Sequence, residues 1–468
     1  MQRILTLIAK RYDFYAWVIF AVFTLASILV SLNRFWQYET FYYDFGIFDR
    51  AIWLASRFEA PIIDHLVVGG KIIFADHFNP SIFIFSPLFW ITNESEILLV
   101  AQSVIVGLSG LYIYKIGKIV TKNSLFSLSV LISYYLFVGL QNALISDFHE
   151  TTVSTLFAAL CFYFFLKNKK FWALFFFLIV LGFKESNFLF GIGLSIVFFL
   201  SNKSWRKFSI FLAILSIFWG IMVIKFIIPY FSGGIYGYGV EFTADKLNLI
   251  DGLFGNSAKR STVFHSLWSF SFLSILSPFF WFLIIQDFLV RFFSNRISLG
   301  LHYSALLSVI LAISSLYSFS VLRKIKIIQN NMSIISLLVI CNAIFIYRFI
   351  LHGPLSLSYN KIFYAHTKDF QFLDNLVSQI PPYVTVMTQN NLASHFTHQK
   401  DIWVLKDNYE SYEPEYIVLD FRTGQSANNF FPTKNPALIL KRLIYDKNYL
   451  SIYDNSNQYI FKRKSRDQ

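Results

Sequence analysis

Residues 171–200 read FWALFFFLIVLGFKESNFLFGIGLSIVFFL, and this stretch decides the fold. Two apolar segments, 171–184 and 186–201, meet here at Lys184-Glu185 with scarcely any loop between them. Read as membrane crossings, they place the two charges at membrane depth. A charge in that position costs several kcal/mol unless it is paired, hydrated or functional. The sequence therefore predicts a polar site against a bilayer.

The composition of the whole chain supports a membrane protein. Of its 468 residues, 56% are hydrophobic, 14% are charged and 56 are Phe, and the mean hydropathy is +0.53. Since a soluble domain of this length needs far fewer apolar residues, we predict a polytopic α-helical membrane protein. The net charge of +13 falls mostly in short clusters between apolar segments, which is the positive-inside pattern and argues against nucleic-acid binding. Cys161 and Cys341 lie inside apolar runs, so neither a disulfide framework nor a thiolate metal site is expected.

The first apolar segment, around Tyr15 to Leu32, follows Arg3, Lys10 and Arg11. Basic residues favour the cytoplasmic side, so we expect a cytoplasmic N-terminus. The segment lacks a small-residue cleavage site and is therefore predicted to be a retained span. With the later basic clusters also inside, the spans alternate, and the polar runs that interrupt the apolar sequence all emerge outside. These clusters are Lys115, Lys118 and Lys122; Lys167, Lys169 and Lys170; Lys203, Arg206 and Lys207; and Arg323, Lys324 and Lys326.

The apolar segments predict about eleven spans across the cytoplasmic membrane. Ser277-Pro278 interrupts the apolar stretch from Val263 to Phe293, which we interpret as two crossings, with a re-entrant pair as the alternative. The spans after the first are otherwise expected near 95–114, 124–141, 151–166, 171–184, 186–201, 208–229, 301–321 and 331–351.

The chain becomes more polar beyond Leu351. We therefore expect a membrane domain over 1–355, with a first outer loop over 33–94, and a soluble α/β domain over 356–468. The parity of the spans places this second domain outside the cell membrane. Short β-branched runs predict strands at Val384–Thr388, Ile402–Leu405 and Tyr416–Asp420, and helices are expected at Thr367–Gln379 and Pro436–Tyr445.

Asp44 and Asp49 follow the first span in a stretch that reads as an amphipathic interfacial helix. At about 100° per residue, their spacing puts the two carboxylates on different faces, so only one is expected to point into a cleft. Asp44, beside Tyr42 and Tyr43, is the candidate general base or metal-anchoring carboxylate, because aromatic surroundings raise the cost of an unused charge. The structural alternative is a solvated helix with Asp49 beside Arg50.

Two further runs contain histidine beside acidic residues. His77 and Asn79 precede Pro80, where a polar residue can simply cap the next helix, although capping does not explain an imidazole. Asp147, His149 and Glu150 form the densest cluster, and their oxygen and nitrogen atoms are suitable ligands for a divalent cation. A polar turn with Glu150 at a helix start is the alternative.

The remaining candidates are cations and an aromatic residue. Lys184 can hold a phosphate while Glu185 orients it, or the two can neutralise each other as a buried pair. Arg260, in the loop before Val263, and His302-Tyr303, at the outer end of a later span, are positioned to meet an anionic headgroup. A structural role is the alternative for each.

The polar runs together resemble a family of prokaryotic predicted membrane proteins known as a domain of unknown function. The resemblance extends from about residue 40 to about residue 420, and it rests on the order and spacing of separate motifs. These are Tyr43-Asp-Phe-Gly-Ile-Phe-Asp49 with Trp53, His77-Phe-Asn-Pro80 with Ser86-Pro-Leu88, Asp147-Phe-His-Glu150, Lys184-Glu185 and His302-Tyr-Ser304.

That family in turn resembles the GT-C superfamily of integral-membrane glycosyltransferases. The resemblance implies a GT-C-like fold, a polyprenyl-phosphate-linked sugar donor, a lipid or glycan acceptor and a catalytic acid in the first outer loop. Asp44 matches that acid, although Asp44-Phe45 departs from the common pair of adjacent acids.

A mechanism follows from the resemblance and the residues together. Asp44, Asp147, His149 and Glu150 are the predicted catalytic residues, and the candidate cofactor is Mg²⁺ or Mn²⁺ held by Asp44, Asp147 and His149. The predicted substrate-binding residues are Asp49, His77, Asn79, Lys184, Glu185, Arg260, His302 and Tyr303.

Two other classes of function fit a chain of this kind. A transporter or lipid flippase could use the same ionisable residues to line a path. Their concentration on one predicted face, together with the lack of a detectable internal repeat, argues against it. A surface receptor or assembly protein would bind through the C-terminal region, which contains His395 and His398 but no recognisable catalytic motif.

Overall fold

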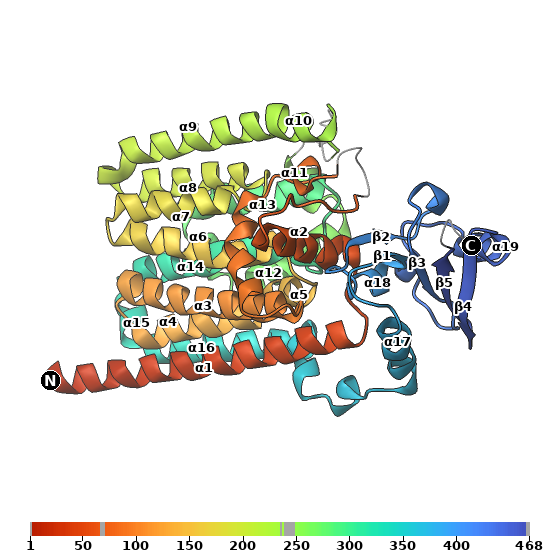
Figure 1. The fold of residues 1–468 in the computed structure, drawn as a ribbon. Coiled ribbons are helices and arrows are strands. Elements are labelled where there is room, and N and C mark those ends of the chain that lie inside the picture. Colours follow the sequence, from red (N-terminus) through yellow and green to blue (C-terminus); the bar gives the residue numbers. More distant parts are fainter. Residues whose placement is uncertain (1, 66–70, 235, 238–248, 465–468) are drawn as a thin grey trace.

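The computed structural model describes residues 2–65, 71–234, 236–237 and 249–464. Its helices lie side by side in a bundle, and a small C-terminal domain sits at one end of that bundle, opposite the N-terminus (Figure 1). The longer helices of the bundle are α1 Gln2–Trp36, α2 Ile47–Ser56, α3 Glu96–Thr121, α4 Ser124–Leu136, α5 Val138–Ile145, α6 Glu150–Leu166, α7 Lys170–Leu181, α8 Asn187–Ser201, α9 Arg206–Met222, α12 Ser257–Ser269, α13 Trp281–Phe293, α14 Ala305–Leu322 and α16 Met332–Phe345. Short helices α10 Ile228–Ser232, α11 Leu249–Phe254 and α15 Lys326–Asn330 complete it.

Five helical segments in the described residues are long and apolar enough to cross a membrane, and a sixth crossing results if the bent pair α4–α5 counts as one span. Four shorter apolar helices, Pro80–Trp90, α6, α7 and α8, accompany them. Helices α12 and α13 have 13 residues each, so each rises only about 20 Å and is too short for a full crossing by length. The predicted count of eleven spans is therefore not confirmed, although the helical membrane architecture is.

The outer surface of the bundle is apolar, as a lipid-facing surface must be. Ile214, Phe218 and Ile221 share one face of α9 and are 61%, 60% and 52% exposed. Inside the bundle, aromatic rings stack closely, with Phe126 against Phe319 at 3.5 Å and Phe165 against Phe198 at 4.0 Å between centroids. Burial of these rings fixes how the helices pack.

The C-terminal domain is built on a mixed five-stranded sheet in the order β2-β1-β3-β5-β4. Strands β1 Thr385–Thr388, β2 Asp401–Val404 and β3 Tyr416–Asp420 are parallel and match the three predicted strands closely. Strands β4 Tyr449–Asn455 and β5 Gln458–Arg463 form an antiparallel hairpin that was not predicted, since β4 is mostly exposed and lacks an apolar run. Helices α17 Lys368–Ser378 and α19 Pro436–Tyr445 lie where expected, and a short helix, α18 Asn390–Ala393, follows β1.

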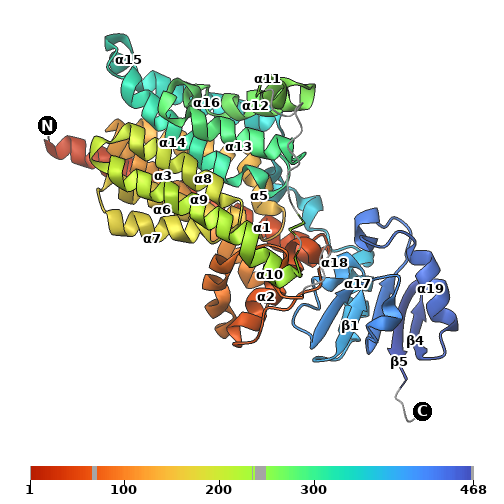
Figure 2. The same ribbon diagram turned by 90° about the horizontal axis from the view of Figure 1, so that it is seen from above.

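The stretch expected as an interfacial helix differs from the prediction. It begins as a π-helical turn over Tyr42–Gly46 and continues as α2, in which Phe48, Asp49 and Ala51 are buried. Figure 2 shows α2 at the end of the bundle that meets the C-terminal domain. The helix is covered by protein because the Pro80–Trp90 segment packs against it and the C-terminal domain contacts Asp49 and Arg50, which the amphipathic pattern could not reveal.

Candidate functional site

Most of the predicted polar residues meet at the end of the bundle next to the C-terminal domain. They come from turns: Asp44 from the π-helical turn, residues 147–150 from the α5–α6 turn, and Lys184-Glu185 from the α7–α8 turn. His302 lies in the 3₁₀ turn that opens α14. Turns at one end of a bundle can bring together residues that are far apart in sequence, and we call this group the polar cluster. Its members are His77, Asp44, Asp147, His149, Glu150, Lys184, Glu185, His302 and Tyr303.

Two ion pairs hold the buried part of the polar cluster. The ammonium of Lys184 lies 2.8 Å from Glu150 Oε1, and His77 Nδ1 lies 2.8 Å from Glu185 Oε1. The Tyr236 hydroxyl donates to the same oxygen of Glu185 at 3.2 Å. Glu150 and Glu185 are almost completely buried, and these partners offset the desolvation of their charges.

His149 connects this buried part to the surface. Its Nε2 lies 3.9 Å from Asp44 Oδ1, and its Nδ1 lies 3.9 Å from Glu150 Oε2. The ring also packs on His302, with centroids 3.7 Å apart. The Asp44 side chain is 53% exposed whereas that of His149 is 6% exposed, so Asp44 lies where a ligand can reach it.

Asp147 is held in a sharp turn behind Asp44. Its φ is 66°, in the left-handed region that Asp tolerates better than most residues. Its Oδ2 accepts from the Phe41 amide at 3.2 Å, and its Oδ1 lies 3.9 Å from the Arg34 guanidinium. Burial, and to a smaller extent the charge of Asp44, raises the pKa of Asp147 to about 7 against the opposing effect of Arg34.

Several contributors to the polar cluster were missed by the sequence reasoning. Arg34 pairs with Asp147, and the Arg296 guanidinium lies 4.9 Å from the Tyr303 ring centroid. The charges of Arg296, Lys184 and Asp44 all act on Tyr303. Arg34 and Arg296 lie at predicted outer ends of spans, where the positive-inside rule expects few basic residues. Their presence there was the sequence signal that could have marked them as candidate site residues.

Three predicted substrate-binding residues are not members of the polar cluster. Asp49 is fully buried, and its Oδ2 accepts from Ser95 at 2.8 Å and lies 3.1 Å from His398 Nε2 in the C-terminal domain. Arg260 lies in the first turn of α12 and not in a loop as predicted; it is exposed and donates to the Phe254 carbonyl at 2.8 Å. Asn79 is fully buried, and its side-chain amide has no hydrogen-bond partner among the described residues.

The described part of the chain contains no group of three His, Cys, Asp or Glu side chains arranged to hold a metal ion. Asp44 and His149 approach each other to 3.9 Å, but Asp147 turns toward Arg34 and Phe41. These residues do not form a ready metal site, so the mechanism proposed below uses no metal.

Comparison with known proteins places the chain in a family. A family model described as "Predicted membrane protein (DUF2079)" matches residues 34–457. The chain belongs to this family. No curated protein matches the sequence.

A solved structure shows the same fold. It is the crystal structure of ArnT from Cupriavidus metallidurans bound to undecaprenyl phosphate, with a TM-score of 0.52 at 10% identity. The match covers 96% of this chain and 98% of that one. At this identity the likeness concerns the fold alone.

The His77–Glu185 pair predicts a pH-dependent stability for this DUF2079 protein. Burial alone would lower the pKa of His77, but the charge of Glu185 has the larger effect and the pKa is raised. Burial alone would raise the pKa of Glu185, but the charge of His77 has the larger effect and the pKa is lowered. The stability due to His77 is present below its unfolded pKa of about 6.5 and is lost as pH rises through the raised folded value. The stability due to Glu185 is present above about 4.5 and is lost as pH falls through the lowered value.

We therefore expect the stability that this pair contributes, measured as the difference in melting temperature between wild type and His77→Gln in lipid, to be largest between about pH 4.5 and 6.5 and to fall above neutral pH. Thermal unfolding measured across pH checks this. His77→Gln should flatten the alkaline decline, whereas His366→Gln, at an exposed pair with Asp374, should leave it intact. An unchanged alkaline decline in His77→Gln would assign it to another group.

Proposed function

We propose that this protein is a membrane glycosyltransferase that moves a sugar from a polyprenyl-phosphate carrier to an acceptor on the outer face of the cytoplasmic membrane. The observation that supports it most directly is the polar cluster itself. It combines an accessible carboxylate, Asp44, with a histidine behind it and with the cations Lys184 and Arg296 near Tyr303. These are the parts that a displacement at a sugar phosphate requires.

In the proposed reaction, Asp44 acts on the acceptor, and the cations near Tyr303 act on the leaving phosphate. Asp44 accepts the proton of the acceptor hydroxyl as its oxygen forms a bond to the anomeric carbon. The bond from that carbon to the phosphate oxygen breaks, and the electron pair leaves with the lipid phosphate. Lys184 and Arg296 stabilise the phosphate anion, and Tyr303 can donate to it. Attack opposite to the leaving group inverts the configuration of the sugar.

The topology proposed from the basic residues agrees with the arrangement of the bundle. Lys118 pairs with Asp13 at 2.6 Å, and the Arg323 guanidinium donates to the Thr121 carbonyl. These contacts gather basic residues at the end where α1 begins, opposite the C-terminal domain (Figure 1). With that end in the cytoplasm, the polar cluster and the C-terminal domain face outward.

The test is transfer of label from a panel of radiolabelled polyprenyl-phosphate sugars by the purified protein in lipid. We expect Asp44→Asn to lower release about 100-fold or more, because it removes the general base. The matched control is Asp454→Asn, an exposed carboxylate on β4 far from the polar cluster, which should behave as wild type. An Asp44→Asn variant with full activity would remove Asp44 from the mechanism. Lipid movement across the bilayer without sugar release would favour the flippase alternative.

A further inference from the structure

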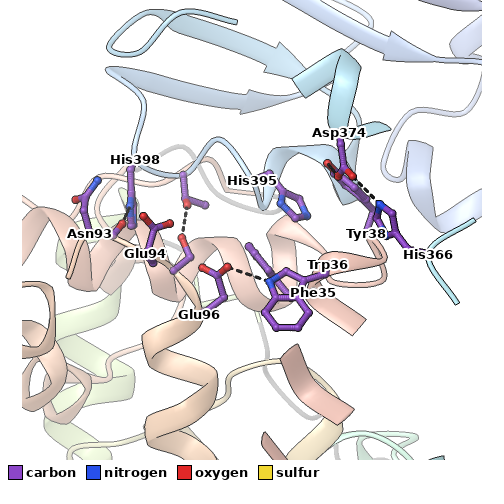
Figure 3. A pocket seen from close by; sticks show the side chains of 12 residues that line it. Phe35, Trp36, Tyr38, Asn93, Glu94, Glu96, His366, Asp374, His395 and His398 are labelled. Carbon is purple, nitrogen blue, oxygen red and sulfur yellow. Dashed lines mark hydrogen bonds and ion pairs between the residues drawn. The ribbon is translucent and has the colours of Figure 1, made fainter. Parts of the chain in front are cut away.

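A hollow lies between the bundle and the C-terminal domain, and none of the residues that line it belongs to the polar cluster. It has a volume of about 580 Å³ (Figure 3). Its walls are the end of α1, the turn before α3, the segment leading into α17, and the loop after α18. The residues that line it are Phe35, Trp36, Tyr38, Asn93, Glu94, Ser95, Glu96, His366, Asp374, His395, Thr397 and His398. Cavities between domains are common places for small ligands.

The charge of this interdomain pocket differs from that of the chain. The protein carries a net charge of +13, yet no Lys or Arg is among the described residues that line the pocket. Asp374 is already engaged by the Tyr38 hydroxyl at 2.9 Å and by His366 at 2.8 Å. Glu94 and Glu96 form no ion pair with any described residue, and Glu96 accepts only the neutral Trp36 indole N–H, at 3.1 Å. The pocket therefore presents two uncompensated carboxylates.

His395 adds an acceptor to these carboxylates. Its ring packs against Phe35 and Tyr38, with centroids 4.3 and 4.2 Å away. Its Nε2 is shielded from solvent and has no hydrogen-bond partner in the described part of the chain. Burial lowers the pKa of His395 to about 4, so the ring is neutral at pH 7 and one nitrogen can accept a hydrogen bond.

Aromatic faces complete the chemistry of the wall. Trp36 is 50% exposed at the edge of the pocket, and Phe35 and Tyr38 also line the pocket (Figure 3). Aromatic faces attract cations, and carboxylates and imidazole nitrogens accept from N–H donors. A quaternary ammonium could contact the aromatic faces but has no N–H to donate. A primary ammonium can contact the aromatic faces and also donate to the carboxylates and the imidazole.

We propose that this interdomain pocket binds a ligand with a primary ammonium group, held by Glu94 and Glu96 with His395 as a neutral acceptor and Trp36 as an aromatic wall. The inference is independent of the proposed transfer reaction. Because the wall comes from both domains, a bound ammonium also strengthens the docking of the C-terminal domain on the bundle. The group can be part of a soluble amine or of an ethanolamine lipid headgroup.

The experiment uses the full-length protein in nanodiscs and has one arm for each source. In the first arm, calorimetry follows titration of spermidine into phosphatidylcholine discs, with propan-1-ol as the uncharged control. We expect saturable binding that the double variant Glu94→Gln/Glu96→Gln weakens about tenfold or more. In the second arm, the melting temperature is compared between phosphatidylcholine and phosphatidylethanolamine discs, and an increase in wild type that the double variant lacks identifies the lipid headgroup.

A matched control and a competing cation make the test decisive. Asp454→Asn removes a carboxylate from the exposed strand β4 and should bind spermidine as wild type does. Saturable spermidine binding in the first arm, or a rise in melting temperature in the second, supports the proposal when it depends on Glu94 and Glu96. It is overturned by equal binding in the double variant, by no response in either arm, or by complete displacement of spermidine by Mg²⁺ at an equal concentration.

Discussion

Lys184→Met is expected to lower both the stability and the activity of this protein. Glu150 is fully buried, and its carboxylate lies 2.8 Å from the Lys184 ammonium. Glu185 also acts on the Lys184 ammonium, so two carboxylates favour its charged form. Removing one partner of a buried pair costs about 3–5 kcal/mol. Thermal unfolding in lipid should therefore show a clear drop in melting temperature.

A double variant separates the structural role of Lys184 from its chemical one. Glu150→Gln/Lys184→Met removes both charges, so no buried charge is left unpaired, and most of the lost melting temperature should return. Sugar release should not return, because the cation proposed to stabilise the departing phosphate is still missing. Lys184→Arg keeps the charge and should retain the fold. Recovery of transfer in the double variant would show that Lys184 serves only the stability of the protein.

The sequence could single out several residues of the polar cluster because the cost of an ionisable side chain in an apolar chain does not depend on the fold. Asp44, His149 and Lys184 were selected on that ground, and the structure brings them to one end of the bundle. The Asp49 carboxylate is equally costly to bury, but Ser95 and His398, from two other segments, compensate for its burial. No local pattern could distinguish these two uses of a buried carboxylate.

Long-range contacts account for the other differences from the prediction. Arg34 and Arg296 look like ordinary span-flanking residues until the fold sets them beside Asp147 and Tyr303. The span count depended on apolar length alone, and in the stretch predicted to make two crossings α12 and α13 are both too short to cross. Three strands of the C-terminal sheet were visible because they are buried apolar runs, whereas β4 is exposed for most of its length.

Arg50→Ala should detach the C-terminal domain from the segment that carries Asp44. Arg50 is buried in α2, and its guanidinium donates to the carbonyls of Thr397 at 2.9 Å and Lys400 at 2.7 Å, as well as to that of Gln399. Hydrogen bonds to a charged group contribute about 1.5–3 kcal/mol each, and alanine leaves all three carbonyls without this donor. We expect faster amide exchange over residues 397–401, measured by hydrogen–deuterium exchange in lipid.

The same variant tests whether docking orders the segment that carries Asp44. Asp44 belongs to the turn that leads directly into α2, and the Tyr43 amide donates to Asn390 in the C-terminal domain at 3.3 Å. Loosening this contact should also speed exchange over residues 41–46 and lower sugar release, because Asp44 loses its fixed position beside His149.

Arg57→Ala provides the matched control for this effect. Arg57 lies just after α2, packs 4.1 Å from the Trp53 ring centroid and donates to Asn93 at 2.9 Å, all within the membrane domain. Its loss should leave exchange at 397–401 close to wild type. If Arg50→Ala speeds exchange only there, with residues 41–46 still protected and transfer intact, the C-terminal domain is a separate module. If residues 41–46 lose protection and sugar release falls in parallel, docking of that domain is required for activity. The buried contacts of α2 would then be what hold Asp44 in place.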